Sequence, residues 1–180
     1  MHRILVIAVC ACLLLPCADS LASGGTAASR VLVEKLVRDS LRAWETGDEE
    51  LLLSAVVPEL QFAFPGTRTD AAGAMRVFRY WKEHYRDTRV YIHWILIDGN
   101  RFAAEYQFAT TSIESGRRTV AGTVAIGEVR NGRITLLKEY VDGRVSRLQE
   151  TGELPLEEGE EPFPWPRSDR SWPWSEPQAE

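Results

Sequence analysis

The chain has 180 residues and a formal net charge of −5, which leaves room for one domain with a leader and a tail. This modest acidity argues against nucleic acid as a partner, because nucleic-acid binding requires a basic face. The only basic pair of note, Arg117-Arg118, is interpreted as a solvated hairpin turn.

The first 22 residues have the organisation of a secretory signal peptide. Arg3 supplies a positive start, and Ile4 to Leu15 is an apolar run too short to span a bilayer. Ser20-Leu21-Ala22 offers the small residues of a cleavage site. We therefore expect a mature chain that begins near Ser23, has no membrane span and is exported, either to a periplasm or out of the cell.

All three cysteines, Cys10, Cys12 and Cys17, lie inside this leader. The mature protein is therefore expected to contain no disulfide and no thiolate metal site. Leu14-Leu15-Pro16-Cys17 also resembles a lipoprotein signal, so a lipid anchor is the alternative to soluble export.

The first part of the mature chain has helical periodicity. Arg30 to Glu45 is predicted to be an amphipathic helix, because apolar residues recur at spacings of three and four: Val33, Leu36, Val37, Leu41 and Trp44. Gly47 suits the end of this helix and Asp48 the start of the next one. The segments that follow are predicted as a short helix, a short strand and a third helix, at Glu49 to Val56, Gln61 to Phe64 and Ala71 to Tyr85.

The second part has the signature of strands joined by tight turns. Four strands are predicted, at Val90 to Asp98, Arg101 to Thr111, Arg117 to Val129 and Ile134 to Val141. Consecutive hairpins make a mostly antiparallel sheet, and long strands bend. The fold class is therefore α+β: a cone-shaped, curved sheet with about three N-terminal helices in its hollow and a cavity, over residues 30–149.

Composition changes at Glu150. Residues 150–180 hold six of the nine prolines, three of the six tryptophans and an acidic cluster at Glu157, Glu158, Glu160 and Glu161. The prolines exclude helix and favour extended chain. Residues 150–180 are therefore predicted to be an acidic, Pro/Trp-rich tail. It is either disordered or docked through Phe163 and Trp165 on the domain or on a partner subunit.

Several short motifs, taken in order, are similar to those of a known family. They are Trp44-Glu-Thr-Gly-Asp48, Phe62-Ala-Phe-Pro-Gly66, Asp98-Gly-Asn-Arg-Phe-Ala-Ala104, and Asn131-Gly-Arg-Ile134 leading to Glu139-Tyr-Val-Asp142. From Leu32 to Arg147 the chain resembles the SnoaL-like branch of the nuclear transport factor 2-like superfamily, which includes ketosteroid isomerase and polyketide cyclases. The resemblance implies the cone fold and a homodimer. It does not select one activity, since this fold hosts cyclases, isomerases, dehydratases, hydrolases and binders.

The catalytic residues of the family carry over only in part. Glu139 falls on the acid/base Asp of SnoaL-like cyclases, and Asp142 falls on the second Asp of the same motif. The pocket histidine of those cyclases meets Thr110-Thr-Ser112 and is absent. The ketosteroid isomerase base meets Phe64-Pro65 and is absent too, which argues against steroid isomerisation of that type.

Glu139 is the first candidate for catalysis. Because side chains alternate along a strand, Thr135, Leu137, Glu139 and Val141 share one face. If that face lines the cavity, burial should raise the pKa of Glu139 and suit it to moving protons near neutral pH. The alternatives are that Glu139 faces solvent while Tyr140 fills the core, or that an arginine pairs with Glu139.

His93, the only histidine in a predicted strand, is the second catalytic candidate, with a hydrogen-bonded structural role as its alternative. Aromatic residues that could line the pocket or polarise a substrate oxygen are Trp44, Phe64, Tyr80, Trp81, Trp94 and Tyr140, although such residues also serve as core. One histidine and scattered acids do not form a metal site, so neither a metal nor a cofactor is predicted.

These observations lead to one functional interpretation with two alternatives. The first is an exported SnoaL-like domain that binds a small, largely apolar molecule. If the domain is an enzyme, it would be a cofactor-free isomerase, cyclase or dehydratase with a carboxylate acid/base. The alternatives are a non-catalytic ligand carrier with the same pocket, and a dimeric protein-interaction module that uses the Pro/Trp-rich tail.

Overall fold

The structure is a computed structural model that describes residues 27–163. The predicted signal peptide lies outside this range, as does the tail from Pro164 onward with Trp165. Among the described residues, no helix combines the length and the apolarity needed to cross a membrane.

Three helices precede the main strands, as the hydrophobic spacing predicts. Asp48 and Asp70 start the second and third of them, because each carboxylate accepts a backbone amide hydrogen bond of 2.9 Å in the first turn. Gly47 takes a left-handed conformation (φ 70°) where the first helix ends. The helices are α1 (Ala27–Thr46), α2 (Glu49–Ala55) and α3 (Ala71–His84).

Six strands form one sheet in the order β2-β1-β6-β5-β4-β3. All neighbouring strands are antiparallel except β1 and β6, which run parallel. The predicted hairpins and the α+β fold class are therefore confirmed. The strands are β1 (Val56–Phe64), β2 (Thr67–Thr69), β3 (Tyr85–Asp98), β4 (Arg101–Ser112), β5 (Arg118–Arg130) and β6 (Arg133–Val141).

Two strands begin earlier than the sequence predicts. β1 starts at Val56 and passes through Pro58, and its register with β6 is irregular between Val56 and Gln61. A proline cannot donate to a sheet ladder, so the irregularity accommodates it. β3 starts at Tyr85, directly after α3, and has a register shift between Arg86 and Arg89.

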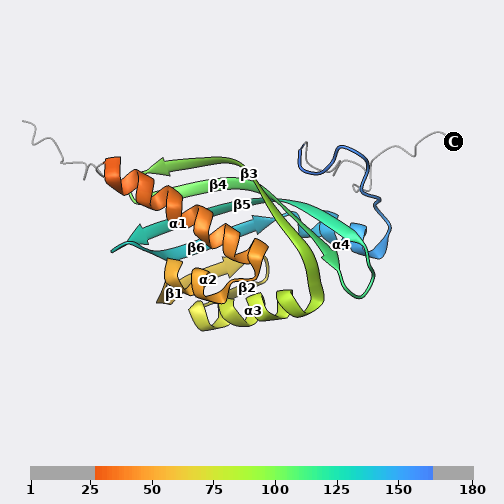
Figure 1. The fold of residues 1–180 in the computed structure, drawn as a ribbon, viewed down its shortest axis with the longest axis horizontal. Helices are drawn as coiled ribbons and strands as arrows, with labels where there is room; N and C mark the ends of the chain where they lie inside the picture. Colours follow the sequence, from red (N-terminus) through yellow and green to blue (C-terminus); the bar gives the residue numbers. More distant parts are fainter. Residues whose placement is uncertain (1–26, 164–180) are drawn as a thin grey trace, which may run out of the picture.

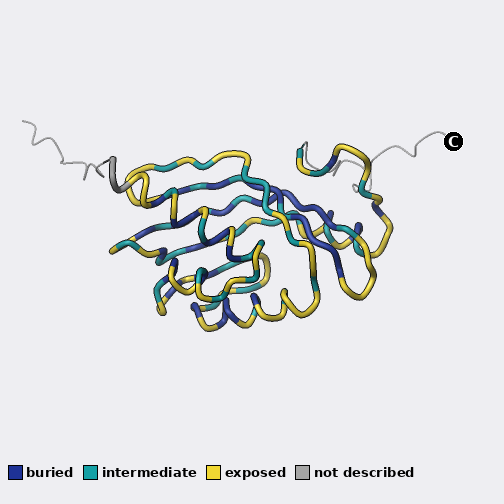
Figure 2. Tube along the Cα trace, in the orientation of Figure 1, coloured by how far each residue is buried: buried dark blue, intermediate teal, exposed yellow. Residues whose placement is uncertain are grey.

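The sheet is strongly bent, and α1 lies diagonally across it (Figure 1). α1 covers the inner face, where its apolar stripe joins inward side chains of β4 and β6 in one core that includes Val33, Val37, Phe102, Ala104 and Ile134. Figure 2 shows that β4 and β5 contain long buried stretches, whereas β3, at the sheet edge, is more exposed. α2 and α3 lie beside β1, away from the middle of the sheet (Figure 1).

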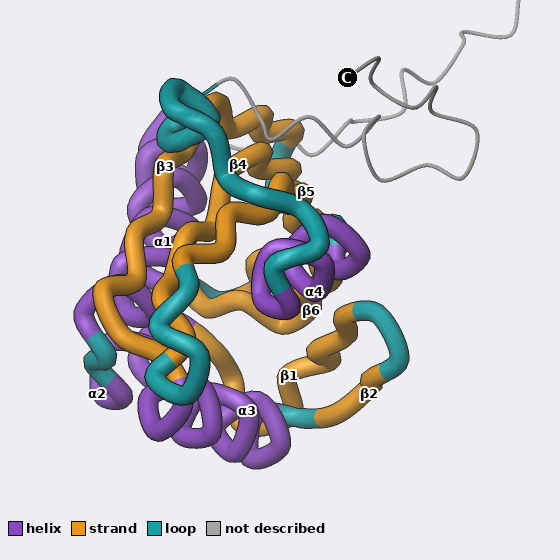
Figure 3. Tube along the Cα trace, turned by 90° about the vertical axis from the view of Figure 1, so that its right-hand side faces the viewer, coloured by secondary structure: helices purple, strands orange, loops and turns teal. Residues whose placement is uncertain are grey.

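A fourth helix, α4 (Gly143–Thr151), was not predicted from the sequence. Asp142 starts it by accepting a hydrogen bond from the Val145 amide at 3.2 Å, and Gly152 ends it in a left-handed conformation (φ 82°). Gln149 of α4 accepts a hydrogen bond from the Val120 amide of β5 at 2.7 Å. β6 ends at Val141, and beyond that point α4 lies beside β5 in its place. Figure 3 shows β5, β6 and α4 side by side.

Residues 152–163, called here the C-terminal strap, return from α4 to the outer face of the sheet. Glu161 bonds the Arg118 guanidinium at 2.5 and 3.0 Å and accepts a hydrogen bond from the Tyr91 hydroxyl at 2.9 Å. Gln107, which is fully buried, donates to the Glu160 carbonyl at 2.8 Å. Phe163 contacts the ring of His93, with ring centroids 5.0 Å apart. The first part of the predicted tail is thus packed on the domain.

Candidate active site

A cavity of about 340 Å³ opens between the inner face of the sheet, the helices and α4. Most of its lining is apolar or aromatic, and within residues 27–163 no basic residue lines it. The residues are Leu41, Trp44, Phe62, Phe64, Pro65, Val77, Trp81, Tyr85, Tyr106, Phe108, Thr110, Thr119, Ala121, Thr123, Glu139, Val141, Gly143, Ser146 and Glu150. This size and character are typical of a site for a small organic molecule.

A tyrosine–carboxyl pair lies in this cavity. The Tyr106 hydroxyl of β4 donates a hydrogen bond to Glu139 Oε1 of β6 at 2.8 Å. The two strands are separated by β5, whose inward residues between them are the small Thr123 and Ala125. Small side chains on the middle strand leave space for the Tyr106 ring to reach across it.

The apolar surroundings change the acidity of both groups. Burial raises the pKa of the Glu139 carboxyl above its ordinary value, and the hydrogen bond from Tyr106 opposes this shift only in part. Burial and the adjacent carboxyl raise the pKa of the Tyr106 hydroxyl well above its ordinary value. Tyr106 therefore keeps its proton at neutral pH and acts as a hydrogen-bond donor, while Glu139 is a stronger base than an exposed glutamate.

Three threonines add hydroxyls to the cavity wall. Thr110 and Thr119 face each other on β4 and β5, and Thr123 lies beside Tyr106. The Thr123 hydroxyl is buried and has no hydrogen-bond partner in the described part of the chain. A buried hydroxyl without a partner is costly, so this atom is available to a bound molecule or a water.

Aromatic rings form a further part of the wall. Trp81 packs edge-to-face against Phe108, with centroids 5.0 Å apart, and stacks on Tyr85 at 4.0 Å. Trp44 packs against Phe108 at 6.3 Å. The Trp81 ring nitrogen donates to Thr88 at 3.2 Å, which fixes the indole in place. The wall is thus rigid and presents ring surfaces to the cavity.

α4 contributes the last part of the lining through Gly143, Ser146 and Glu150. Burial raises the pKa of the Tyr85 hydroxyl, and the nearby Glu150 carboxylate adds to this shift. A second tyrosine and a second glutamate therefore line the cavity, and the glutamate comes from a helix that sequence reasoning missed.

The structure brings four of the predicted site residues to the cavity: Glu139, Trp44, Phe64 and Trp81. The face of β6 that carries Glu139 and Val141 looks inward, and Tyr140 lies on the outer face with 61% of its surface exposed. Tyr80 lies on the exposed side of α3, stacked on His84. The prediction that Tyr140 and Tyr80 line the pocket is therefore wrong.

His93 and Trp94 also lie outside the cavity, for a local backbone reason. The register of β3 with β4 shifts between Ile92 and Trp94, so Ile92 and Ile95 both join the core while the two residues between them face outward. His93 is exposed and bonds Glu105 at 3.0 Å. This β-bulge interrupts the simple alternation on which the prediction rested. A catalytic position for His93 and a pocket position for Trp94 are therefore not supported.

Tyr106 is the functional residue that the sequence analysis did not select as a candidate. The available signal was its phenol: a tyrosine on an inward face usually finds a polar partner, and Glu139 was a candidate for it. Asp142, the second acid of the motif, has a structural role instead because it begins α4.

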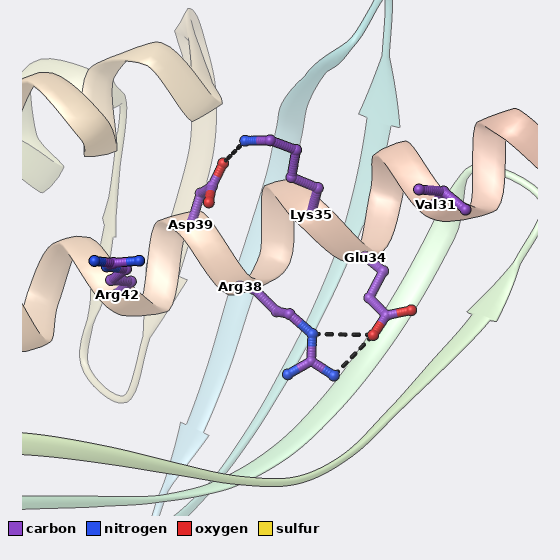
Figure 4. Close-up of a pocket in the computed structure, with 6 residues that line it drawn as sticks. All are labelled: Val31, Glu34, Lys35, Arg38, Asp39 and Arg42. Carbon is purple, nitrogen blue, oxygen red and sulfur yellow. Dashed lines mark hydrogen bonds and ion pairs between the residues drawn. The ribbon is translucent and has the colours of Figure 1, made fainter.

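Two other findings concern the rest of the described surface. A second hollow lies on the exposed side of α1 (Figure 4), lined by charged residues in helical pairs: Glu34 with Arg38 and Lys35 with Asp39. Such i, i+4 pairs are usual on a solvated helix face.

Within residues 27–163, no cluster of His, Cys, Asp and Glu could hold a metal ion.

Comparison with known proteins agrees with this geometry. The family model described as SnoaL-like domain matches residues 37–137. No curated protein sequence matches the chain.

Solved structures have the same fold. IdmH from Streptomyces antibioticus, a candidate polyketide cyclase, is 22% identical with a TM-score of 0.61, covering 67% of this chain and 98% of its own. An LEH-like epoxide hydrolase from M. tuberculosis is 22% identical with a TM-score of 0.59, covering 68% and 91%. A candidate isomerase from Rhodopseudomonas palustris is 19% identical with a TM-score of 0.59, covering 67% and 96%.

Proposed function

We propose that this chain, which belongs to the SnoaL-like family, binds a small, largely apolar molecule in its cavity and transforms it by cofactor-free acid/base chemistry. The observation that carries this proposal is the Glu139 carboxyl, which lies in an apolar cavity with its pKa raised and with Tyr106 bonded to it at 2.8 Å. A carboxyl of raised pKa inside a cleft is typical of a catalytic acid or base.

The chemistry follows from the states of the two groups. As a carboxylate, Glu139 removes a proton from a carbon or hydroxyl of the bound molecule, and Tyr106 holds the carboxylate in position through its hydrogen bond. In an isomerisation, the protonated Glu139 returns the proton to a second atom of the same molecule. In a dehydration, it gives the proton to a departing hydroxyl group, which leaves as water. Both reactions restore the Glu139 carboxylate and require no oxidant or reductant.

The similar structures support a reaction class rather than a substrate. Their descriptions name a polyketide cyclase, an epoxide hydrolase and an isomerase, all of which handle small organic molecules. Acid/base steps are common to these three classes of enzyme. The lining of this cavity supports an apolar body with few polar groups as the molecule that is bound.

Solvent exchange tests the proposal with model compounds in place of the natural substrate. A panel of cyclic ketones and polyketide-like phenols is incubated with the protein in D₂O, and deuterium incorporation is followed by NMR. Glu139→Gln is expected to lower the exchange rate by roughly 10²–10⁴-fold, the usual contribution of a general base, and to leave ligand binding nearly unchanged. Glu105→Gln is the matched control, because Glu105 bonds His93 away from the cavity.

Retention of full exchange activity by Glu139→Gln would rule out this mechanism. The ligand carrier is the other outcome. In that case a molecule bound by the purified protein is recovered chemically unchanged, no member of the panel exchanges, and Glu139→Gln alters only the affinity.

A further inference from the structure

Among the described residues, the charged side chains that line the cavity are all acidic. Two carboxyl groups, Glu139 and Glu150, line it, and no lysine, arginine or histidine of the described residues does. Arg117 donates to the main-chain carbonyl of Glu150 at 3.0 Å rather than to its carboxylate. The interior therefore has a negative potential that an anionic molecule would oppose and a cation would satisfy.

The two carboxyl groups lie at different depths. Glu139 is bonded to Tyr106 in the middle of β4, whereas Glu150 is close to Tyr85, which pairs with Ser112 at the end of β4. Thr110, another cavity residue, is four residues beyond Tyr106, a rise of about 13 Å along a strand. An elongated molecule can thus meet Glu139 with one end and Glu150 with the other.

Aromatic faces and an unpartnered hydroxyl complete this surface. Tyr85 and Trp81 stack at 4.0 Å on the side of the cavity where Glu150 lies. Aromatic ring faces attract ammonium groups, and the attraction increases when water is excluded. The Thr123 hydroxyl, buried beside Tyr106 and without a partner among the described residues, is a further acceptor.

We propose that the cavity selects a cationic ligand: an apolar molecule that carries a protonated amine, with the ammonium group held between Glu150 and the rings of Tyr85 and Trp81. This inference rests on the proposed function, because it takes the cavity to be the ligand site. It adds the substrate class and assigns a specificity-determining role to Glu150. Glu139 remains free in this arrangement to act on the other end of the molecule.

Three molecules with one skeleton test the proposal: 1-adamantylamine, 1-adamantanol and 1-adamantanecarboxylate, titrated into the full mature chain by calorimetry at pH 7. The amine is expected to bind about tenfold more tightly than the alcohol, a difference typical of one partly desolvated charge interaction, and the carboxylate more weakly than both. Glu150→Gln is expected to remove most of the preference for the amine and to leave the affinity for the alcohol unchanged.

The control variant is Glu158→Gln, which removes the same charge from an exposed position of the C-terminal strap. It should keep the preference for the amine, and a thermal melt of each variant checks that the fold is intact. Equal binding of amine and alcohol, or an unchanged preference in Glu150→Gln, overturns the inference while the cavity remains a ligand site. If none of the three molecules binds, both the inference and the ligand-site premise of the proposed function are contradicted.

Discussion

The surroundings of two glutamates, Glu139 and Glu161, shift their pKa values in opposite directions. Glu139 lies in an apolar cavity, so burial raises its pKa. Glu161 is bonded by the Arg118 guanidinium and by Tyr91, which together lower its pKa despite partial burial. The first arrangement weakens the charged form and suits chemistry, whereas the second stabilises the charged form and suits structure. Opposite effects of pH on stability follow.

Glu139 is expected to reduce the stability of the folded protein at neutral pH. A raised pKa means that the folded protein holds this proton while the unfolded chain has released it. Stability is therefore lost as pH rises above the ordinary glutamate value. Glu139→Gln should melt at the same temperature as the parent or higher at pH 7, and the difference should vanish below the ordinary pKa of a glutamate. Calorimetric melts across this pH range measure it, and a clearly lower Tm at pH 7 would contradict the assignment of Glu139.

Glu161 of the C-terminal strap is expected to increase the stability of the folded protein at neutral pH. Its lowered pKa contributes stability above the ordinary glutamate value, and this contribution is lost as pH falls through the folded pKa. Glu161→Gln should lose about 2 kcal/mol at pH 7, the usual cost of breaking a charged hydrogen-bonded pair. Urea unfolding at neutral and acidic pH measures the loss. An effect that persists undiminished in acid would indicate a packing role rather than an ionic one.

The Tyr106 hydroxyl is expected to set the working pH range of Glu139. Its hydrogen bond lowers the pKa of Glu139 and so opposes the effect of burial. Tyr106→Phe removes that bond, so the pKa of Glu139 should rise further and the pH–rate profile of exchange should move to higher pH. The profile is measured by NMR in the D₂O assay. A profile that keeps its position with a uniformly lower rate would mean that Tyr106 only shapes the cavity.

At the scale of secondary structure, the sequence predicted the elements whose patterns are periodic or marked by turns. The helices before the sheet and the hairpins after it are present because apolar spacing and Asp-Gly or Asn-Gly turns are local signals. α4 was missed because its apolar residues contact β5 and the strap, which cannot be read from nine residues with few hydrophobic positions. The β3 bulge was missed because it depends on the pairing with β4.

The strap and α4 make the C-terminal part of the chain a structural element, and truncations separate its two portions. A chain that ends at Thr151 loses the bonds of Glu161 and of the Glu160 carbonyl, and it uncovers buried Gln107. It should lose roughly 2–4 kcal/mol, because a charged hydrogen-bonded pair and the hydrogen bond of Gln107 are both removed. A chain that ends at Phe163 retains these contacts and is the control. Thermal melts compare the two, and equal Tm values would contradict a stabilising strap.

At the scale of the whole molecule, the homodimer implied by the family resemblance stays a prediction. The outer face of the sheet exposes apolar side chains, with Leu96 64% and Trp94 42% accessible. These residues contact neither the cavity nor the core, so a substitution there tests association alone. Leu96→Glu should convert a dimer into a folded monomer, as measured by light scattering after gel filtration.

Export also stays a prediction, and fractionation of cells that produce the full chain would test it.

The family match ends at residue 137, before Glu139 and before all of α4. The matched residues include most of the bent sheet and most of the cavity lining, while Glu139 and the lining residues of α4 follow them. Substitutions in this nine-residue helix would therefore change the lining of the cavity while every strand of the sheet stays as it is.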